Sequence, residues 1–171
     1  MPSPPPPPPA RRILGVDPGT RVAGWALVET TGNRSRLVAF DVLRMKTDDM
    51  PTRLKDLADG LRAVIAAQRP TALAVETQFF GKSAASALAV GMARGVALLV
   101  AAESRVPIHE YTPATVKKAV VGNGNASKQQ VAAMVRVILG LAEAPKPADV
   151  TDAIAIALAH AHRGGGANRC G

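Results

Sequence analysis

Hydrophobic and polar positions alternate along the first part of the chain in a pattern typical of short strands. The segments RRILGVD (11–17), VAGWALVET (22–30) and SRLVAFDVLRM (35–45) have this character, and the turn-forming residues DPGT and TGN separate them. Consecutive strands joined by tight turns pair antiparallel. The pattern therefore predicts a three-stranded antiparallel meander at the start of the fold.

Beyond Pro51 the spacing of apolar residues becomes helical. Large aliphatic side chains recur three or four residues apart, at Leu54, Leu57, Leu61, Val64 and Ile65. This spacing predicts an amphipathic helix that ends before Pro70. The segment ALAVE (72–76) then predicts a short buried strand.

The rest of the chain predicts one more strand and four helices, most of them with recognisable ends. The strand is VPIHEYT (106–112), and the helices begin near Ser83, Thr112, Ser127 and Asp149. Serine and threonine favour N-caps, proline at 113 favours a first helical position, and Gly140 favours a helix end. The order βββαβαβααα is typical of an α/β domain with helices packed on a central mixed sheet.

The two ends of the chain differ from the middle in composition. Residues 1–10 hold seven prolines, and residues 163–171 are rich in glycine. Both compositions favour disordered tails, so the sequence predicts one folded domain over residues 11–162.

The segment 84–102 is apolar enough to be considered as a membrane span, but it carries Arg94 near its middle. Because a central arginine is costly in lipid, we expect a buried helix of a soluble domain instead. Gly91 and Gly95 lie one turn apart and would let another backbone approach closely.

Composition limits the function further. The 171 residues carry 21 Lys and Arg against 13 Asp and Glu, a formal charge of +8, which favours a polyanionic partner. The single cysteine, Cys170, excludes a disulfide framework and a cysteine-rich metal site, and indicates a reducing, cytoplasmic setting.

Four acidic residues stand where apolar segments begin or end. Asp17 and Glu76 end two strands, and Asp149 and Asp152 open the last helix on one face. Four carboxylates that converge would repel one another strongly, and no basic residue adjacent in sequence neutralises them. An all-oxygen set suits Mg²⁺ or Mn²⁺, so we expect a divalent-metal site. The alternative is that each acid only caps a helix or forms a turn.

Positive and aromatic residues surround these acids. Lys128, next to the glycine-rich GNGN segment, is a candidate for contacting a phosphate backbone, and Phe79 just after the second acid could stack on an unpaired base. A carboxylate pocket beside positive surface is typical of enzymes that cleave phosphodiesters.

The segments ILGVDPGTRVAGWALVE, AVETQFFGKSAASALAVGMARGVALLVAA, VPIHEYTPATVKKAVVGNGNASKQQVAAMV and ADVTDAIAIALAHAH resemble the RuvC family of bacterial Holliday junction resolvases. The resemblance implies an RNase H-like α/β fold with a central mixed five-stranded sheet. It places the family's acidic tetrad on Asp17, Glu76, Asp149 and Asp152. The resemblance further places DNA contacts on Phe79, Lys117 and Lys128, and more loosely on Lys82, Lys118 and Arg21.

This resemblance also implies two Mg²⁺ ions in each site, with Mn²⁺ as a substitute, and a homodimer that nicks four-way junction DNA at symmetric positions. The branch-migration helicase complex of RuvA and RuvB is the implied protein partner. A non-catalytic junction-binding protein of the same fold is the alternative. The GVDPGT segment also resembles the phosphate loop of actin-like ATPases, but those need two such domains and this chain supplies one.

Overall fold

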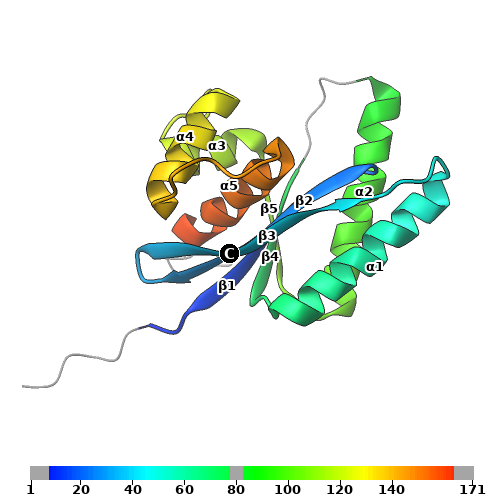
Figure 1. The fold of residues 1–171 in the computed structure, drawn as a ribbon, viewed down its shortest axis with the longest axis horizontal. Coiled ribbons are helices and arrows are strands. Elements are labelled where there is room, and N and C mark those ends of the chain that lie inside the picture. The colour runs from blue at the N-terminus through cyan, green and yellow to red at the C-terminus, as the bar shows by residue number, and fades with distance from the viewer. Residues whose placement is uncertain (1–7, 78–82, 164–171) are drawn as a thin grey trace, which may run out of the picture.

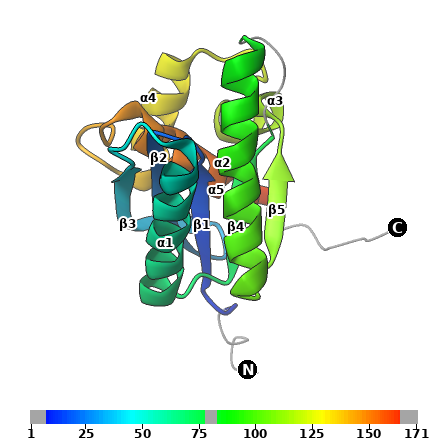
Figure 2. The ribbon, with the colours of Figure 1, turned by 90° about the vertical axis from the view of Figure 1, so that its right-hand side faces the viewer.

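The computed structural model describes residues 8–77 and 83–163, which form a five-stranded sheet between two layers of helices (Figures 1 and 2). The strands are β1 (Arg11–Asp17), β2 (Val22–Thr31), β3 (Arg34–Arg44), β4 (Ala72–Glu76) and β5 (Ile108–Tyr111). The helices are α1 (Met50–Gln68), α2 (Ala84–Glu103), α3 (Pro113–Val121), α4 (Lys128–Leu139) and α5 (Ala148–Arg163). The predicted element order is confirmed; the fifth strand is shorter than expected, and the last helix runs one residue past His162.

The sheet has the strand order β3-β2-β1-β4-β5. Strands β1, β2 and β3 form the predicted antiparallel meander, while β4 runs parallel to β1, and β5 parallel to β4. Because parallel strands end at the same edge, Asp17 and Glu76 follow the paired residues Val16 and Val75 side by side. The topology thus brings two of the four predicted acids to one edge of the sheet.

Alternate side chains of each strand supply two separate cores. Leu14, Val16 and Trp25 pack with α1 and α2, while Ile13, Ala26 and others on the opposite face pack with α3, α4 and α5. Helix α5 lies directly on the sheet, and its residues from Val150 to Ala161 are buried except Asp152. The first turn of α5 is therefore held firmly over the strand ends.

Two glycines allow α5 to lie this close to the sheet. A Cβ atom on Gly24 of β2 would stand 2.1 Å from the carbonyl oxygen of Asp149, and one on Gly15 of β1 would stand 2.0 Å from that of Ala153. Any other residue would have to push the helix away. Gly24 pairs with Asp17 in the sheet, so this close approach occurs beside the first acid.

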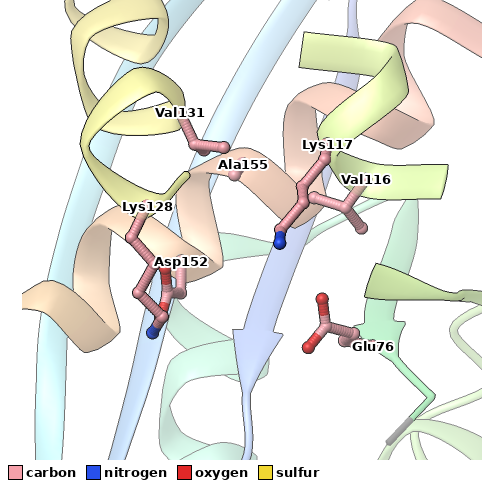
Figure 3. A pocket seen from close by; sticks show the side chains of 7 residues that line it. All are labelled: Glu76, Val116, Lys117, Lys128, Val131, Asp152 and Ala155. Atoms are coloured by element: carbon pink, nitrogen blue, oxygen red, sulfur yellow. The ribbon is translucent and has the colours of Figure 1, made fainter. Parts of the chain in front are cut away.

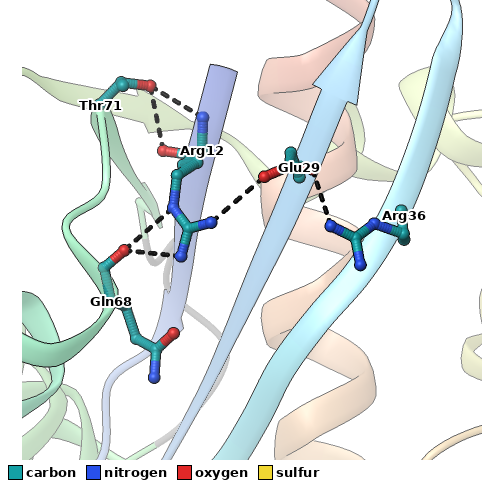
Figure 4. A network of polar contacts seen from close by, with 5 residues as sticks. All are labelled: Arg12, Glu29, Arg36, Gln68 and Thr71. Carbon is teal, nitrogen blue, oxygen red and sulfur yellow. Dashed lines mark hydrogen bonds and ion pairs between the residues drawn. The ribbon is translucent and has the colours of Figure 1, made fainter. Parts of the chain in front are cut away.

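Polar contacts join the strands at the end of the sheet opposite Asp17 and Glu76 (Figure 4). The guanidinium of Arg12 donates to Glu29 at 3.2 Å and to the carbonyl oxygen of Gln68, which ends α1. Arg36 donates to the same Glu29 at 2.8 Å. These contacts join β1, β2, β3 and α1 at the strand ends away from Asp17 and Glu76.

The predicted helix ends are confirmed in detail. Ser83, Thr112 and Ser127 each accept a hydrogen bond from a backbone N–H of the first turn. Ser127 and Gln130 form a reciprocal capping box, which fixes where α4 begins. Gly140 ends α4 in the left-handed conformation, with φ of 63°.

The expectation of a buried second helix is wrong. Only four side chains of α2 are buried, namely Ala93, Ala97, Val100 and Ala101. The helix packs on the sheet and on α1 with one side, and its other side is open among the described residues. Within those residues α2 is also the one helix long and apolar enough to cross a membrane, although its Arg94 forms an ion pair with Glu110 of β5 at 2.6 Å.

His160, near the C-terminal end of α5, packs between this helix and β5. His160 is buried and shares a 2.6 Å hydrogen bond with the hydroxyl of Tyr111, and its ring stacks on His109. Burial lowers the pKa of His160 to about 4, with His109 and Arg11 adding to the effect. The imidazole is therefore neutral at physiological pH and links α5 to β5.

Candidate active site

Four carboxylates meet where β1, β4 and the first turn of α5 come together. Asp17 ends β1, Glu76 ends β4, and Asp149 and Asp152 lie on successive positions of one face of α5. We call this group the acidic site. Residues up to 135 positions apart in sequence thus share one end of the sheet, as the sequence predicted.

The electrostatics of the acidic site couple Asp17 to the other three acids. Burial and, in decreasing order, the charges of Asp152, Asp149 and Glu76 together raise the pKa of Asp17 to about 7. Burial and the charge of Asp152 likewise raise the pKa of Glu76. Asp17 and Glu76 are therefore harder to ionise than free carboxylic acids, and a bound cation would favour their charged forms.

One lysine already neutralises part of this charge. Lys128, the first residue of α4, donates from Nζ to Oδ2 of Asp152 at 2.7 Å. We expected no neutralising base adjacent in sequence, and this partner lies 24 residues away; the pairing itself was not predicted. Lys128 opposes the rise in the pKa of Asp17 and Glu76, and Lys117 acts on Glu76 in the same sense.

A small pocket of about 70 Å³ opens between these groups (Figure 3). Its polar lining comes from Glu76 and Asp152 on one hand and from Lys117 and Lys128 on the other. Val116, Val131 and Ala155 form its apolar wall. In Figure 3 the Lys117 ammonium points into the pocket above Glu76, and the Lys128 side chain lies against Asp152. Acidic and cationic groups thus face one cavity wide enough for water or a phosphate oxygen.

The donor set of the acidic site fits a hard divalent cation. All four side chains offer only carboxylate oxygens, which Mg²⁺ and Mn²⁺ prefer, and two of them have raised pKa values that a cation would offset. Among residues 8–77 and 83–163, however, no three acids are already gathered as a ready ligand set. The side chains would therefore have to draw closer together to hold a cation jointly.

Other predicted contacts fall in different places. Arg21 is exposed after the β1–β2 turn and pairs with Asp48 at 2.7 Å. Lys118 is exposed on α3 and does not line the pocket. Phe79 and Lys82 lie outside the described residues.

Sequence reasoning missed the residue that positions the acids on α5. Gly24 has no side chain, and the carbonyl group of Asp149 packs against its backbone in the space that a side chain would fill. The available signal was a glycine within an otherwise apolar strand, which indicates a close backbone approach. The residue it would meet could not be read from the sequence.

Comparison with known proteins agrees with this geometry. The family model described as crossover junction endodeoxyribonuclease RuvC matches residues 13–160. The protein of that name from Heliobacterium modesticaldum is 50% identical over 151 residues, which is 88% of this chain and 93% of the relative. Its counterpart from Desulforamulus reducens is 49% identical over 150 residues, 87% of this chain and 92% of the relative.

Solved structures of RuvC and of a related resolvase resemble this fold. Thermus thermophilus RuvC in complex with Holliday junction substrate superposes with a TM-score of 0.85 at 39% identity, covering 90% of this chain and 94% of that one. The yeast mitochondrial Holliday junction resolvase Ydc2 shares the fold, with a TM-score of 0.65 at 17% identity over 89% of this chain and 79% of that one. The expected RNase H-like fold is confirmed, and the chain belongs to the RuvC family of crossover junction endodeoxyribonucleases.

Proposed function

We propose that this chain is a Holliday junction resolvase that makes symmetric paired nicks in four-way DNA junctions during recombination and repair. One observation carries the proposal: four acids from β1, β4 and α5 converge beside a lysine-lined pocket in a member of this nuclease family. A fold with carboxylates alone would bind cations; adding Lys117 and Lys128 makes it suited to a polyanion.

Asp17, Glu76, Asp149 and Asp152 are proposed to hold Mg²⁺, two ions in each site, with Mn²⁺ able to substitute. Such bound ions would lower the pKa of the attacking water and stabilise the leaving oxygen. Asp17 lies deepest in the acidic site and feels all three other carboxylates, which supports a central position among the ligands.

Lysine side chains would hold the phosphate that is cut. Lys117 and Lys128 reach the same pocket from α3 and α4, so their ammonium groups can face one backbone segment from two directions. By resemblance to the family, Phe79 remains proposed as a junction contact, and Lys82, Lys118 and Arg21 as weaker DNA contacts.

The test is cleavage of a labelled four-way junction and of a linear duplex, each with Mg²⁺, with Mn²⁺ and with a chelator. We expect nicking of the junction alone, and only with metal. The non-catalytic alternative predicts junction binding in every condition without any nick, and that result would replace our proposal.

A homodimer is proposed because two symmetric cuts need two related sites. The exposed side of α2 supports this proposal. Leu88 and Leu99 are 62% and 56% exposed, and Met92 and Gly95 lie between them at spacings of four, three and four residues, which places all four on one face. No described atom lies within 4 Å of a Cβ built on Gly91 or Gly95, so a second helix could pack closely there.

Replacing Leu88 and Leu99 together with glutamate should convert the dimer to a monomer, because four charges would be buried between the two copies. Sedimentation velocity at micromolar concentration measures the change. Val137→Glu is the matched control, since Val137 is 65% exposed but lies on α4. A dimer that survives the double substitution would exclude this face of α2.

The RuvA and RuvB branch-migration complex and a cytoplasmic location are proposed from the family alone. Co-sedimentation of the purified chain with both proteins on a junction tests the partnership. If the chain sediments as it does without them, this part of the proposal is wrong.

A further inference from the structure

Two cations lie on the side of the acidic site away from Lys117 and Lys128. Arg44 ends β3, and Lys146 lies in the connection between α4 and α5; both side chains are exposed. Within the described ranges neither forms an ion pair or a side-chain hydrogen bond. Their charge is therefore available to a partner outside the chain.

The register of the sheet directs Arg44 towards the acidic site. Val42 pairs with Gly24, against which the carbonyl of Asp149 rests, and Arg44 follows two residues later on the same face. Val42 packs with the α5 core and Leu43 with the α1 core, which confirms the alternation at this end of β3. Arg44 thus lies on the α5 side of the sheet.

Two hydrogen bonds fix the segment around Lys146 against the start of α5. The Thr151 hydroxyl donates to the carbonyl oxygen of Pro145 at 2.6 Å, and the backbone N–H of Val150 donates to that of Pro147 at 3.0 Å. Figure 2 shows the connection between α4 and α5 beside β3, at the edge of the sheet opposite β5. Lys146 is thereby placed at the helix start that carries Asp149.

Taken together, cations flank the acids on both sides. Lys117 and Lys128 lie by Glu76 and Asp152, and Arg44 and Lys146 lie beyond Asp149. Strand β3 is two strands from β1, about 10 Å at the usual strand spacing of about 4.8 Å. A DNA strand rises about 3.4 Å per nucleotide, so this distance spans about three nucleotides.

We propose that Arg44 and Lys146 form a second phosphate-binding edge, which holds the cut strand two or three phosphates away from the scissile one. This inference rests on the proposed function, because it requires DNA to cross the acidic site. The second edge adds a path for the DNA to the proposed function: the cut strand runs from the lysine-lined pocket over β1 and β2 towards β3.

Binding of a labelled four-way junction in chelator, measured over a series of salt concentrations, tests the edge. Arg44→Ala and Lys146→Ala should each weaken binding about fivefold and flatten the plot of log K against log salt by about 0.9, the loss of one phosphate contact. Arg34→Ala is the matched control, because Arg34 is an exposed arginine at the other end of β3. It should leave both quantities unchanged.

A second measurement locates the contact. After the wild-type cut has been mapped, neutral methylphosphonates are placed at the second and third phosphates on each side of it. On one of these sides, the neutral linkages should weaken binding by the wild type as much as Arg44→Ala weakens binding to unmodified DNA. The same linkages should not weaken binding by Arg44→Ala any further.

The outcomes separate the two proposals. If the wild type does not bind the junction, the proposed function is wrong. If the wild type binds and Arg44→Ala and Lys146→Ala match Arg34→Ala in affinity and salt slope, the second edge is wrong and the proposed function stands.

Discussion

Asp17→Asn should reduce junction cleavage by about a thousandfold or more while leaving junction binding nearly unchanged. The charges of all three other carboxylates of the acidic site act on Asp17, so the substitution removes the negative charge that we propose lies central among the metal ligands. The amide has the same shape and cannot carry the negative charge. Single-turnover cleavage with Mg²⁺ and an electrophoretic binding assay in chelator measure the two effects.

The same substitution should stabilise the protein. Burial and neighbouring charge raise the pKa of Asp17 from 3.8 to about 7, so above that pH the folded chain holds a carboxylate that prefers water. An unfolded Asp17 ionises near pH 4, and the free energy of unfolding therefore falls as pH rises from about 4 to about 7. Asp17→Asn does not suffer this loss, and at pH 8 without metal we expect its free energy of unfolding to exceed that of the wild type by up to about 4 kcal/mol.

Calorimetric melting in chelator at pH 5 and pH 8 checks this expectation. The gain should be full at pH 8 and less than half as large at pH 5, because there the folded carboxyl is still protonated while an unfolded Asp17 is already mostly ionised. Mg²⁺ should raise the melting temperature of the wild type more than that of the variant. Asp56→Asn, an exposed acid on α1, is the control and should change neither melting nor cleavage. If Asp17→Asn cleaves the junction at the wild-type rate, Asp17 has no role in catalysis.

Local rules explain why so much of the fold could be predicted. The caps Ser83, Thr112 and Ser127 act through neighbouring backbone groups, and strand alternation follows from the two-residue repeat of side chains. The acids could be proposed as a site because an ionised side chain at the end of an apolar strand is costly to bury unless a partner or a cation compensates its charge. Their convergence then followed from the parallel pairing of β1 with β4.

Contacts between distant segments explain what could not be predicted. The pairing of Lys128 with Asp152 depends on where α4 lies relative to α5, and no spacing in the sequence encodes that. The exposure of α2 was missed for a related reason. Its composition is that of a buried helix, and whether the second apolar side meets this chain or another copy is decided by tertiary and quaternary packing.

Gly24→Ala should lower the rate of cleavage by about a hundredfold although it replaces none of the four acids. The added methyl group would stand 2.1 Å from the carbonyl oxygen of Asp149, and backbone cannot yield as a flexible side chain can. The start of α5 must therefore move, and Asp149 and Asp152 move with it relative to Asp17 on β1. Displacements of about 1 Å in a catalytic group are enough for an effect of this size.

Gly60→Ala provides the matched control for crowding. Its added methyl group would also be too close to a neighbour, 2.9 Å from Cδ1 of Leu43, but that neighbour is the mobile end of a side chain, between α1 and β3. We expect Gly60→Ala to keep the cleavage rate within about threefold of the wild type, since the crowding it causes lies on the α1 side of the sheet and not on the α5 side that carries Asp149 and Asp152. Single-turnover cleavage compares the two variants, and circular dichroism melting confirms that each is folded. If Gly24→Ala cleaves like Gly60→Ala, then the close approach of α5 to β2 serves packing alone, and the positions of Asp149 and Asp152 do not depend on it.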